Sequence, residues 1–454
     1  MSYIAEQKFF LIFLTLFLIS FHGYGLPPFN IGSLKIVYND LATLPFILFG
    51  LIYLRRQSII ELLYAYKEIW AVLALLSAWL LFQAFRAAQV MDGITLFLQH
   101  AVNMTLLSSL MIYFIGHKQA VPFSKILFTI FITGAVIATI SLIIFYITVY
   151  TTNKVMVFGY EVKIGYILSR GRDIRLGGFA RDPNFYAFWL TLSLTASTLF
   201  IRRSWKFMVI GVIIAFTLWL TQSRTFFIAY AFSLFLICSL PLIKNKSQKL
   251  LNTCFSHLLI IVMSFLAVAV VNKTEQHFAN KYNYNQIIEG ASLYDPSPTK
   301  TVSDGFRMTD RWKILNSNNP NARPARWKAL LNDFCTPPCF NEKSEWQLNL
   351  SPLLIGRGLR STQLRLGDKY SHNSYIDLLY ETGLVGLGLF AAFGLLVLIR
   401  ALPYLKDPET LVIFQAWVAC AVFFMGFGMF YDQYFWFVSA LLLGKLYKQR
   451  QEVK

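Results

Sequence analysis

The stretch SYIDLLYETGLVGLGLFAAFGLLVLIRAL, residues 374–402, begins with polar side chains and continues as an apolar run. An α-helix of about 20 residues crosses the ~30 Å hydrocarbon core of a bilayer, because each residue adds ~1.5 Å. No charged side chain occurs between Gly383 and Ile399. The stretch therefore predicts a membrane-spanning helix whose first turns, which carry Asp377 and Glu381, are unusually polar.

Similar apolar runs make up most of the chain. Of its 454 residues, 56% are hydrophobic and 14% are charged, whereas soluble domains carry about 25% charged residues. Polar surface is too scarce for a water-soluble protein, so the sequence predicts an all-α integral membrane protein with about 12 transmembrane helices. The predicted spans lie at about 8–26, 38–54, 68–85, 94–115, 122–150, 183–201, 205–222, 224–243, 251–271, 374–402, 411–430 and 434–448. The first apolar run lacks a basic start and a small-residue cleavage site, so we expect it to remain as a mature helix rather than a signal peptide.

The basic residues of the short loops alternate from side to side. Cytoplasmic loops of membrane proteins are rich in Lys and Arg. If the N-terminus is cytoplasmic, the short outer loops hold little beyond Lys35, Arg86 and Arg224. The alternation persists through all the predicted spans, so we expect both termini in the cytoplasm.

The chain divides into three parts on this topology. Residues 1–271 hold spans one to nine and an outer segment at 151–182, residues 272–373 form a large extracytoplasmic loop between spans nine and ten, and residues 374–454 hold the last three spans. The two outer segments contain about half of the 41 Lys and Arg. Such charge indicates either attraction to anionic lipid or a site for an anionic ligand.

Three predicted spans begin at the outer surface with unusual polar residues. Span six follows RLGGFARDPNFYAFW, residues 175–189, in which Arg175 and Arg181 precede the helix cap Asp182. Span eight follows LTQSRTFF, residues 220–227, which places Arg224 at the membrane boundary. These arginines could simply anchor the helices at lipid headgroups.

Span ten begins with His372, with Ser371 or Asn373 as the cap. Asp377 and Glu381, four residues apart, share a helical face with Asn373. A lone His at a membrane interface is often an anchor, but ionisable groups within a span usually face a wet cavity or a partner. Glu381 could instead have a structural role, paired with a buried base.

The three helix N-termini together favour a phosphate or pyrophosphate ligand. Each projects about half a positive charge and free N–H groups, and guanidinium groups bind phosphate oxygens in pairs. The large loop adds Arg357, Arg360 and Arg365, and it also carries Trp312 and Trp327, which could stack on sugars or lie on the bilayer.

Other kinds of site have little support in the sequence. The chain contains no glycine-rich nucleotide motif and no HExxH zinc motif. Cys335 and Cys339 flank TPP in the outer loop, where an oxidising compartment permits a small disulfide ring. Because no His lies near them, we expect no metal site there.

These stretches resemble the O-antigen ligase and polymerase superfamily of bacterial surface-polysaccharide enzymes. The family's HNxYLxxLxExGxxG-like run corresponds to HNSYIDLLYETGLVG at 372–386, and its R-x-G-G/T-F…(N/D)-P-N run corresponds to RLGGFARDPN at 175–184. Its tight outer turn corresponds to QSRT at 222–225, and its R-W…G-x-G pattern corresponds to ARWKALL…IGRG from 325 to 358. All four motifs occur in family order.

The resemblance implies a metal-independent, inverting glycosyltransferase without a cofactor. Such an enzyme takes a glycan from undecaprenyl pyrophosphate on the periplasmic face of the bacterial inner membrane and passes it to a hydroxyl. The expected partners are this lipid-linked donor, a glycan acceptor, membrane lipids and a chain-length regulator, with no nucleic acid.

The resemblance also assigns residues. Arg224 corresponds to the family's turn arginine and His372 to its histidine, which acts as a base or as a donor to phosphate. Arg175, Arg181, Arg326, Arg357, Arg360 and Asn373 are the expected pyrophosphate-binding or substrate-binding residues.

The acceptor separates two activities in lipopolysaccharide biosynthesis. A polymerase passes the chain to another lipid-linked repeat unit, whereas a ligase passes it to the lipid A core. DPN, QSRT and the long loop favour the polymerase. A non-enzymatic transporter of lipid-linked glycans is a third interpretation, but transporters keep polar groups near the midplane and show repeated halves, and the sequence shows neither.

Overall fold

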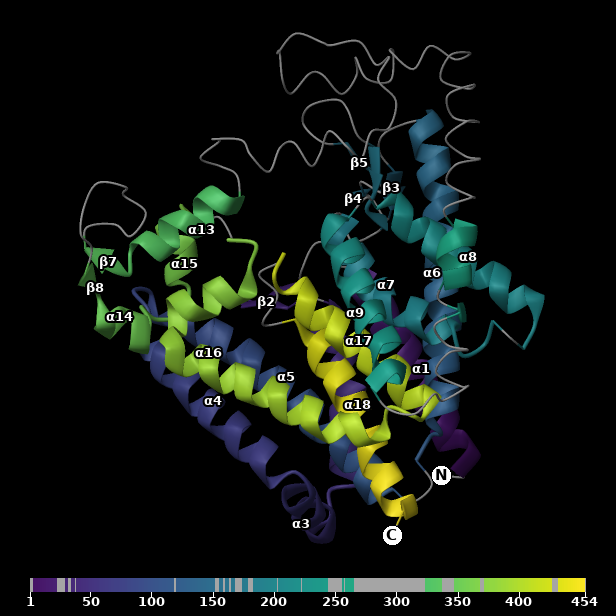
Figure 1. Ribbon diagram of the computed structural model, residues 1–454, viewed down its shortest axis with the longest axis horizontal. Helices are drawn as coiled ribbons and strands as arrows, with labels where there is room; N and C mark the ends of the chain where they lie inside the picture. The colour runs from purple at the N-terminus through teal and green to yellow at the C-terminus, as the bar shows by residue number, and fades with distance from the viewer. Residues whose placement is uncertain are drawn as a thin grey trace. The chain divides into compact units, whose positions relative to one another are not determined.

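The structure is a computed structural model of the chain (Figure 1). It describes residues 3–22, 29–31, 34–36, 38–117, 120–151, 155–157, 160–162, 165–167, 174–178, 183–201, 203–221, 223–243, 255–256, 258–264, 323–336, 347–367, 371–426 and 432–453.

Helices dominate the described residues, and their positions follow the predicted apolar runs closely. Of these helices, five are long and apolar enough to cross a membrane: Ile4–Phe21, Lys67–Phe85, Val90–Gly116, Phe123–Ile144 and Ser374–Tyr404. Shorter apolar helices cover Asp40–Ile52, Trp205–Leu220, Arg224–Leu236 and Pro408–Phe423. The chain is therefore a helical membrane protein. Much of the predicted ninth span, and residues 272–322 of the large loop, lie outside the described residues.

The main helices are α1 (Tyr3–His22), α2 (Tyr38–Ile52), α4 (Lys67–Phe85), α5 (Val90–Gly116), α6 (Phe123–Thr151), α7 (Pro183–Ser197), α8 (Trp205–Leu220), α9 (Arg224–Ile243), α16 (Ser374–Ala401), α17 (Pro408–Phe423) and α18 (Gln433–Val453). A further helix, α3 (Arg56–Ala65), was not predicted. Its ten residues are too few to cross a bilayer, so no membrane-spanning run marks it in the sequence. It leaves Ile60, Leu63 and Tyr64 exposed.

Short antiparallel hairpins lie between the helices. They pair β1 (Phe29–Ile31) with β2 (Leu34–Ile36), β3 (Val155–Val157) with β4 (Tyr160–Val162), β5 (Gly165–Ile167) with β6 (Ile174–Leu176), and β7 (Cys335–Thr336) with β8 (Gln347–Leu348). The expected all-α class omitted these strands, because strands of two or three residues leave no clear alternation in a sequence.

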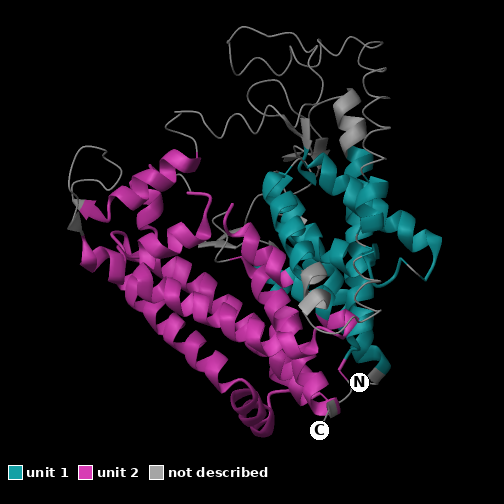
Figure 2. Ribbon diagram, in the orientation of Figure 1, with its two compact units in different colours: residues 1–43, 121–312, 411–416 teal, residues 44–120, 313–410, 417–454 magenta. Residues whose placement is uncertain are grey.

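The chain forms two compact units (Figure 2). Unit 1 comprises residues 1–43, 121–312 and 411–416 and contains α1, α6, α7, α8 and α9. In it, Gly134 of α6 lets α7 approach so closely that a Cβ at that position would meet the Ser193 side chain. The Ser193 hydroxyl donates to the carbonyl of Ile130 at 3.0 Å. Small and hydroxylated residues at such a contact are typical of helices that pack inside membranes.

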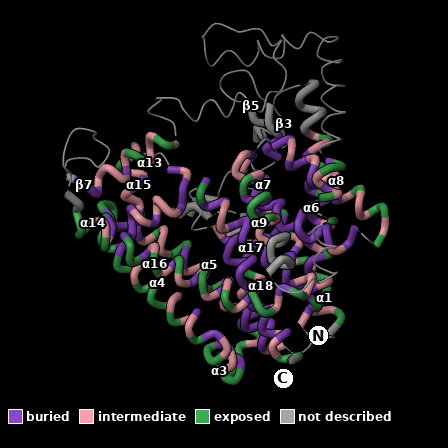
Figure 3. Tube along the Cα trace, viewed as in Figure 1, coloured by how far each residue is buried: buried purple, intermediate pink, exposed green. Residues whose placement is uncertain are grey.

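Unit 2 comprises residues 44–120, 313–410 and 417–454, and α4, α5, α16 and α18 form its interior. Helices α4 and α16 run antiparallel. At one end Arg400 pairs with Glu68 at 2.8 Å, and at the other the Trp79 indole donates to the carbonyl of Thr382 at 2.8 Å. Helices α5 and α18 run parallel: His100 and Trp436 contact each other nearer their starts, and Lys448 near the end of α18 donates to the His117 carbonyl at the end of α5. Buried residues recur along each of these helices (Figure 3).

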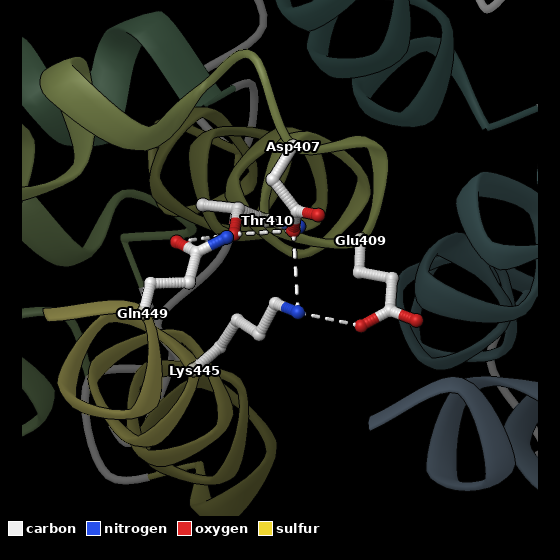
Figure 4. Close-up of polar contacts among 5 residues, drawn as sticks. All are labelled: Asp407, Glu409, Thr410, Lys445 and Gln449. Carbon is white, nitrogen blue, oxygen red and sulfur yellow. Dashed lines mark hydrogen bonds and ion pairs between the residues drawn. The ribbon is translucent and has the colours of Figure 1, made fainter. Parts of the chain in front are cut away.

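A polar cluster joins the start of α17 to the last turns of α18 (Figure 4). The Lys445 ammonium lies 2.6 Å from Glu409 and 3.3 Å from Asp407. The Thr410 hydroxyl contacts Asp407 at 2.9 Å and Gln449 at 3.0 Å. The Asp407 side chain also caps α17, so one carboxylate satisfies both the helix start and a partly buried lysine.

Candidate functional site

The first turns of α16 end in a break at Gly383, where φ is 69° and ψ is −172°. The break frees backbone carbonyls that a continuous helix would use. The amides of Arg357 and Gly358 donate to the carbonyls of Tyr380 and Glu381, each at 3.0 Å. Non-helical backbone in a membrane protein is stable only where the protein itself satisfies it, and this turn does so.

The turn that fills the break joins α14 (Leu350–Ile355) to α15 (Ser361–Arg365). Gly356 has φ 82°, and a Cβ there would collide with the backbone of residues 381–383. The end of α4 holds the other side of the turn. The Gln83 side-chain amide donates to the carbonyl of Ile355 at 2.5 Å, and the Gln83 backbone carbonyl accepts from the amide of Leu359 at 3.2 Å. The turn is thus fixed between α4 and α16.

Arg357 and Arg360 of this turn and Arg365 of α15 differ in the negatively charged groups that they contact. Arg360 pairs with Asp92 at 2.6 Å, and Arg365 binds both oxygens of Asp333 at 2.7 and 3.1 Å. Arg357 donates to the backbone carbonyl of Asp333 at 2.6 Å. Within the described part of the chain no carboxylate forms an ion pair with Arg357. Its exposed guanidinium is therefore the one of the three best suited to an added anion.

Asp333 connects this turn to α13 (Arg323–Asn332) and to α16. Besides Arg365, the Tyr380 hydroxyl donates to it at 2.7 Å. Burial alone would raise the pKa of the Asp333 carboxyl, but hydrogen bonds from Arg365 and Tyr380 outweigh it and lower that pKa. The same pair raises the pKa of Arg365. Leu330, Phe334 and Tyr380 form a small apolar core around the contact.

His372 lies in a compact turn just before α16. The Ser371 carbonyl accepts from the Trp327 indole at 2.9 Å, and the Ser371 hydroxyl accepts from the amide of Asn373 at 2.9 Å. The Asn373 side chain caps α16 by accepting from the amides of Tyr375 and Ile376. Of the two predicted cap residues, Asn373 is thus the cap. The indole N–H of Trp327 stabilises the turn through its hydrogen bond to Ser371.

His372 and Arg360 share an unusual backbone conformation. Their φ angles are 61° and 66°, and among the described residues they are the only two, other than glycines, with positive φ. That conformation costs free energy in a residue with a Cβ and is concentrated at functional sites. Both were selected from the sequence for other reasons, so the backbone singles them out independently.

The two acids of α16 lie beneath these turns. Glu381 is 7% exposed, and the backbone amides of Arg360 and Thr362 face its carboxyl group. Glu381 therefore follows the structural alternative, although its partners are amides at the start of α15 rather than a buried base. Asp377 faces Ser371 and Thr362, and its Oδ1 atom is buried with no hydrogen-bond partner among the described residues.

The remaining predicted residues are distributed over both units. Arg326 lies on α13 in unit 2. In unit 1, Arg224 is the half-buried first residue of α9, and the Ser223 hydroxyl caps that helix by accepting from the amide of Phe226 at 3.3 Å. Arg175 lies in β6, its side chain outside what the structure describes, and Arg181 lies wholly outside it. Unit 2 thus brings together Arg357, Arg360, His372 and Asn373.

Sequence reasoning missed the acidic and amide partners of the site. Gln83 lies at the end of α4 and Asp92 in the first turn of α5, more than 250 residues before their respective partners Ile355 and Arg360. Asp333 follows α13 with no motif around it. The only feature of the sequence that pointed to this region was Arg86, one of the few basic residues of the short outer loops. Arg86 donates to the Gln83 side chain at 3.2 Å.

The structure also bears on cysteines and metals. Cys335 is disulfide-bonded, which the sequence permitted, but its partner is not among the side chains that the structure describes, so the pairing with Cys339 remains open. No group of three or more His, Cys, Asp or Glu in the described ranges could hold a metal ion.

Comparison with known proteins gives no match: no protein-family model and no curated protein matches the chain.

Proposed function

We propose that the protein is a membrane glycosyltransferase that polymerises undecaprenyl-pyrophosphate-linked repeat units of a surface polysaccharide such as O-antigen, on the periplasmic face of the bacterial inner membrane. The observation that carries this proposal is the strained backbone of His372 and Arg360 beside Arg357, at the start of the helix whose motif resembles the O-antigen ligase and polymerase superfamily.

The chemistry follows from the charges. The acceptor hydroxyl attacks the anomeric carbon, the bond from that carbon to the phosphate oxygen breaks, and the pyrophosphate leaves with the electron pair. Arg357 of unit 2 stabilises the negative charge that develops on this leaving group. The resemblance assigns a pyrophosphate-binding role to Arg224 as well. His372 accepts the hydroxyl proton or donates to the phosphate. The anomeric centre is inverted, because the hydroxyl attacks directly.

Helix directions support a topology of twelve spans with cytoplasmic termini. In unit 2 the antiparallel pair α4 and α16 and the parallel pair α5 and α18 run as alternating spans three, ten, four and twelve must run. The disulfide at Cys335 supports an oxidising compartment around the large loop. Both observations support the proposal that the start of α16 lies at the periplasmic side.

The test is the lipopolysaccharide banding pattern of a strain that lacks the protein. A polymerase predicts loss of the ladder with a single core-plus-one-repeat band retained. Loss of every repeat-bearing band, with full-length glycan left on undecaprenyl pyrophosphate, would instead indicate a ligase. Lipid-linked units stranded on the cytoplasmic face would indicate a transporter.

Complementation tests the residues. We expect Arg224→Ala, His372→Ala and Arg357→Ala to fail to restore the ladder, with losses of about 100-fold or more, because each removes an interaction with the reacting groups. The control is Arg56→Ala, which removes an exposed arginine of α3 and should restore a normal ladder. Immunoblots establish equal protein levels. A normal ladder from both Arg224→Ala and His372→Ala would overturn the site assignment.

A further inference from the structure

The buried polar residues beneath the two strained turns form a continuous set. Glu381 faces the backbone amides of Arg360 and Thr362, and the Thr362 hydroxyl faces both Glu381 and Asp377. Asp377 in turn faces Ser371, whose hydroxyl holds the turn that contains His372. The set thus extends from the Arg360 turn to the His372 turn through α16.

This set is buried more deeply than an accidental surface cluster would be. Glu381, Thr362 and Ser371 are 7%, 1% and 0% exposed, whereas Asp377 is half-buried as a residue but has a buried Oδ1 atom. Burial of a carboxyl group inside a membrane protein costs free energy unless hydrogen bonds or a partner charge compensate it, so such groups usually have a function. The Asp377 Oδ1 and Thr362 Oγ1 atoms form no hydrogen bond of good geometry in the described part of the chain, which adds to that cost.

The positions of Asp377 and Glu381 indicate why these carboxyl groups are buried there. Neither Arg360 nor His372 would hold a positive φ by itself, so the surroundings must impose it. Glu381 draws the amides of Arg360 and Thr362 toward α16, and Asp377 lies one helical turn before Glu381, beside Ser371. One face of one helix therefore supports both strained residues.

We propose that Asp377, Thr362 and Glu381 act as one positioning unit that sets Arg360 and His372 together. They do not touch the substrate. Loss of any member releases both turns, since Thr362 lies between the two acids. The unit makes Asp377 a functional residue, although it occupies an unspecified position of the family-like motif. The kinetic part of this proposal rests on the proposed transferase function, but its structural part does not.

Hydrogen exchange measured by mass spectrometry tests the structural part. Asp377→Ala and Glu381→Ala should each raise amide exchange in both turns, at residues 359–363 and 371–374. The control is Glu68→Gln, which breaks the Arg400 pair at the far end of the same two helices and should leave both turns unchanged. Faster exchange confined to the turn nearer the altered residue would overturn the unit.

Kinetics with a lipid-pyrophosphate-linked glycan donor test the positioning role. Each single variant should lower kcat about 100-fold while KM for the donor changes less than about threefold, because misplaced catalytic groups cost rate rather than binding. Asp377→Asn, which keeps the size and one oxygen, should recover most of the rate. The double variant Asp377→Ala/Glu381→Ala should be no more than about threefold worse than either single variant, since members of a unit are not additive.

The failures are distinguishable. A double variant about 10,000-fold slower than the wild type would show independent residues and overturn the unit. A wild-type protein that transfers no glycan would contradict the proposed function, whereas the exchange experiment would still decide whether the unit exists.

Discussion

Asp333 shows how one residue can fix several segments that sequence reasoning treats separately. Its carboxylate accepts from Arg365 and Tyr380, and its carbonyl accepts from Arg357. These contacts lower the pKa of Asp333. A carboxyl group whose pKa is lowered in the folded state stabilises the fold above its unfolded pKa of ~3.9, and this contribution is lost as the pH falls further.

We therefore expect Asp333→Asn to lower the thermal midpoint of the purified protein at pH 7. The difference from the wild type should persist down to about pH 5 and shrink as the pH falls below ~3.9, toward the lowered pKa. Thermal unfolding in detergent between pH 3 and 7 measures this difference. A gap that does not change over that range would mean that the ionised Asp333 adds nothing to stability.

At the scale of elements, the break in α16 depends on a contact distant in sequence. The run TGLVGLG offers several glycines, but only Gly383 leaves the helical conformation. Nothing local distinguishes it, because the break is set by the turn at 356–358 that docks against it. Hydropathy predicted where α16 begins and ends, but it carries no information about such a contact.

Substitution of two glycines in the same helix separates these effects. Gly383→Ala places a Cβ at positive φ against the backbone of Leu354, so we expect a loss of about 1–3 kcal/mol or more. Gly388→Ala is the matched control: nothing lies within 4 Å of its Cβ, and it should be neutral or stabilising by up to ~1 kcal/mol. Thermal unfolding of both variants measures the contrast, and equal midpoints would show that the break is not required for stability.

The candidate site was predicted only in part for the same reason. His372, Asn373 and Arg360 lie near a helix start that a local motif marks, so the sequence indicated them. Asp92, which pairs with Arg360, and Gln83 and Asp333, which hold the neighbouring turn and α15, lie on other elements, and only the folded chain brings them close. Residues whose role depends on a distant partner leave no local pattern.

At the scale of the whole molecule, the helix directions and the disulfide are consistent with the proposed orientation in the membrane. Leu364, on α15, is 40% exposed at the end of unit 2 that holds Cys335. Glu452 is exposed at the opposite end, where Lys448 contacts His117. If the start of α16 faces the oxidising side, a thiol at 364 is accessible from outside the cytoplasmic membrane and a thiol at 452 is not.

Labelling with a membrane-impermeant maleimide tests this orientation. In cells with a permeable outer membrane but an intact inner membrane, Leu364→Cys should react and Glu452→Cys should not, and both should react once the inner membrane is opened. The wild-type protein gives the background from its own cysteines. Labelling of Glu452→Cys alone before the inner membrane is opened would reverse the orientation. The candidate site would then face the cytoplasm, where the proposed periplasmic transfer could not take place.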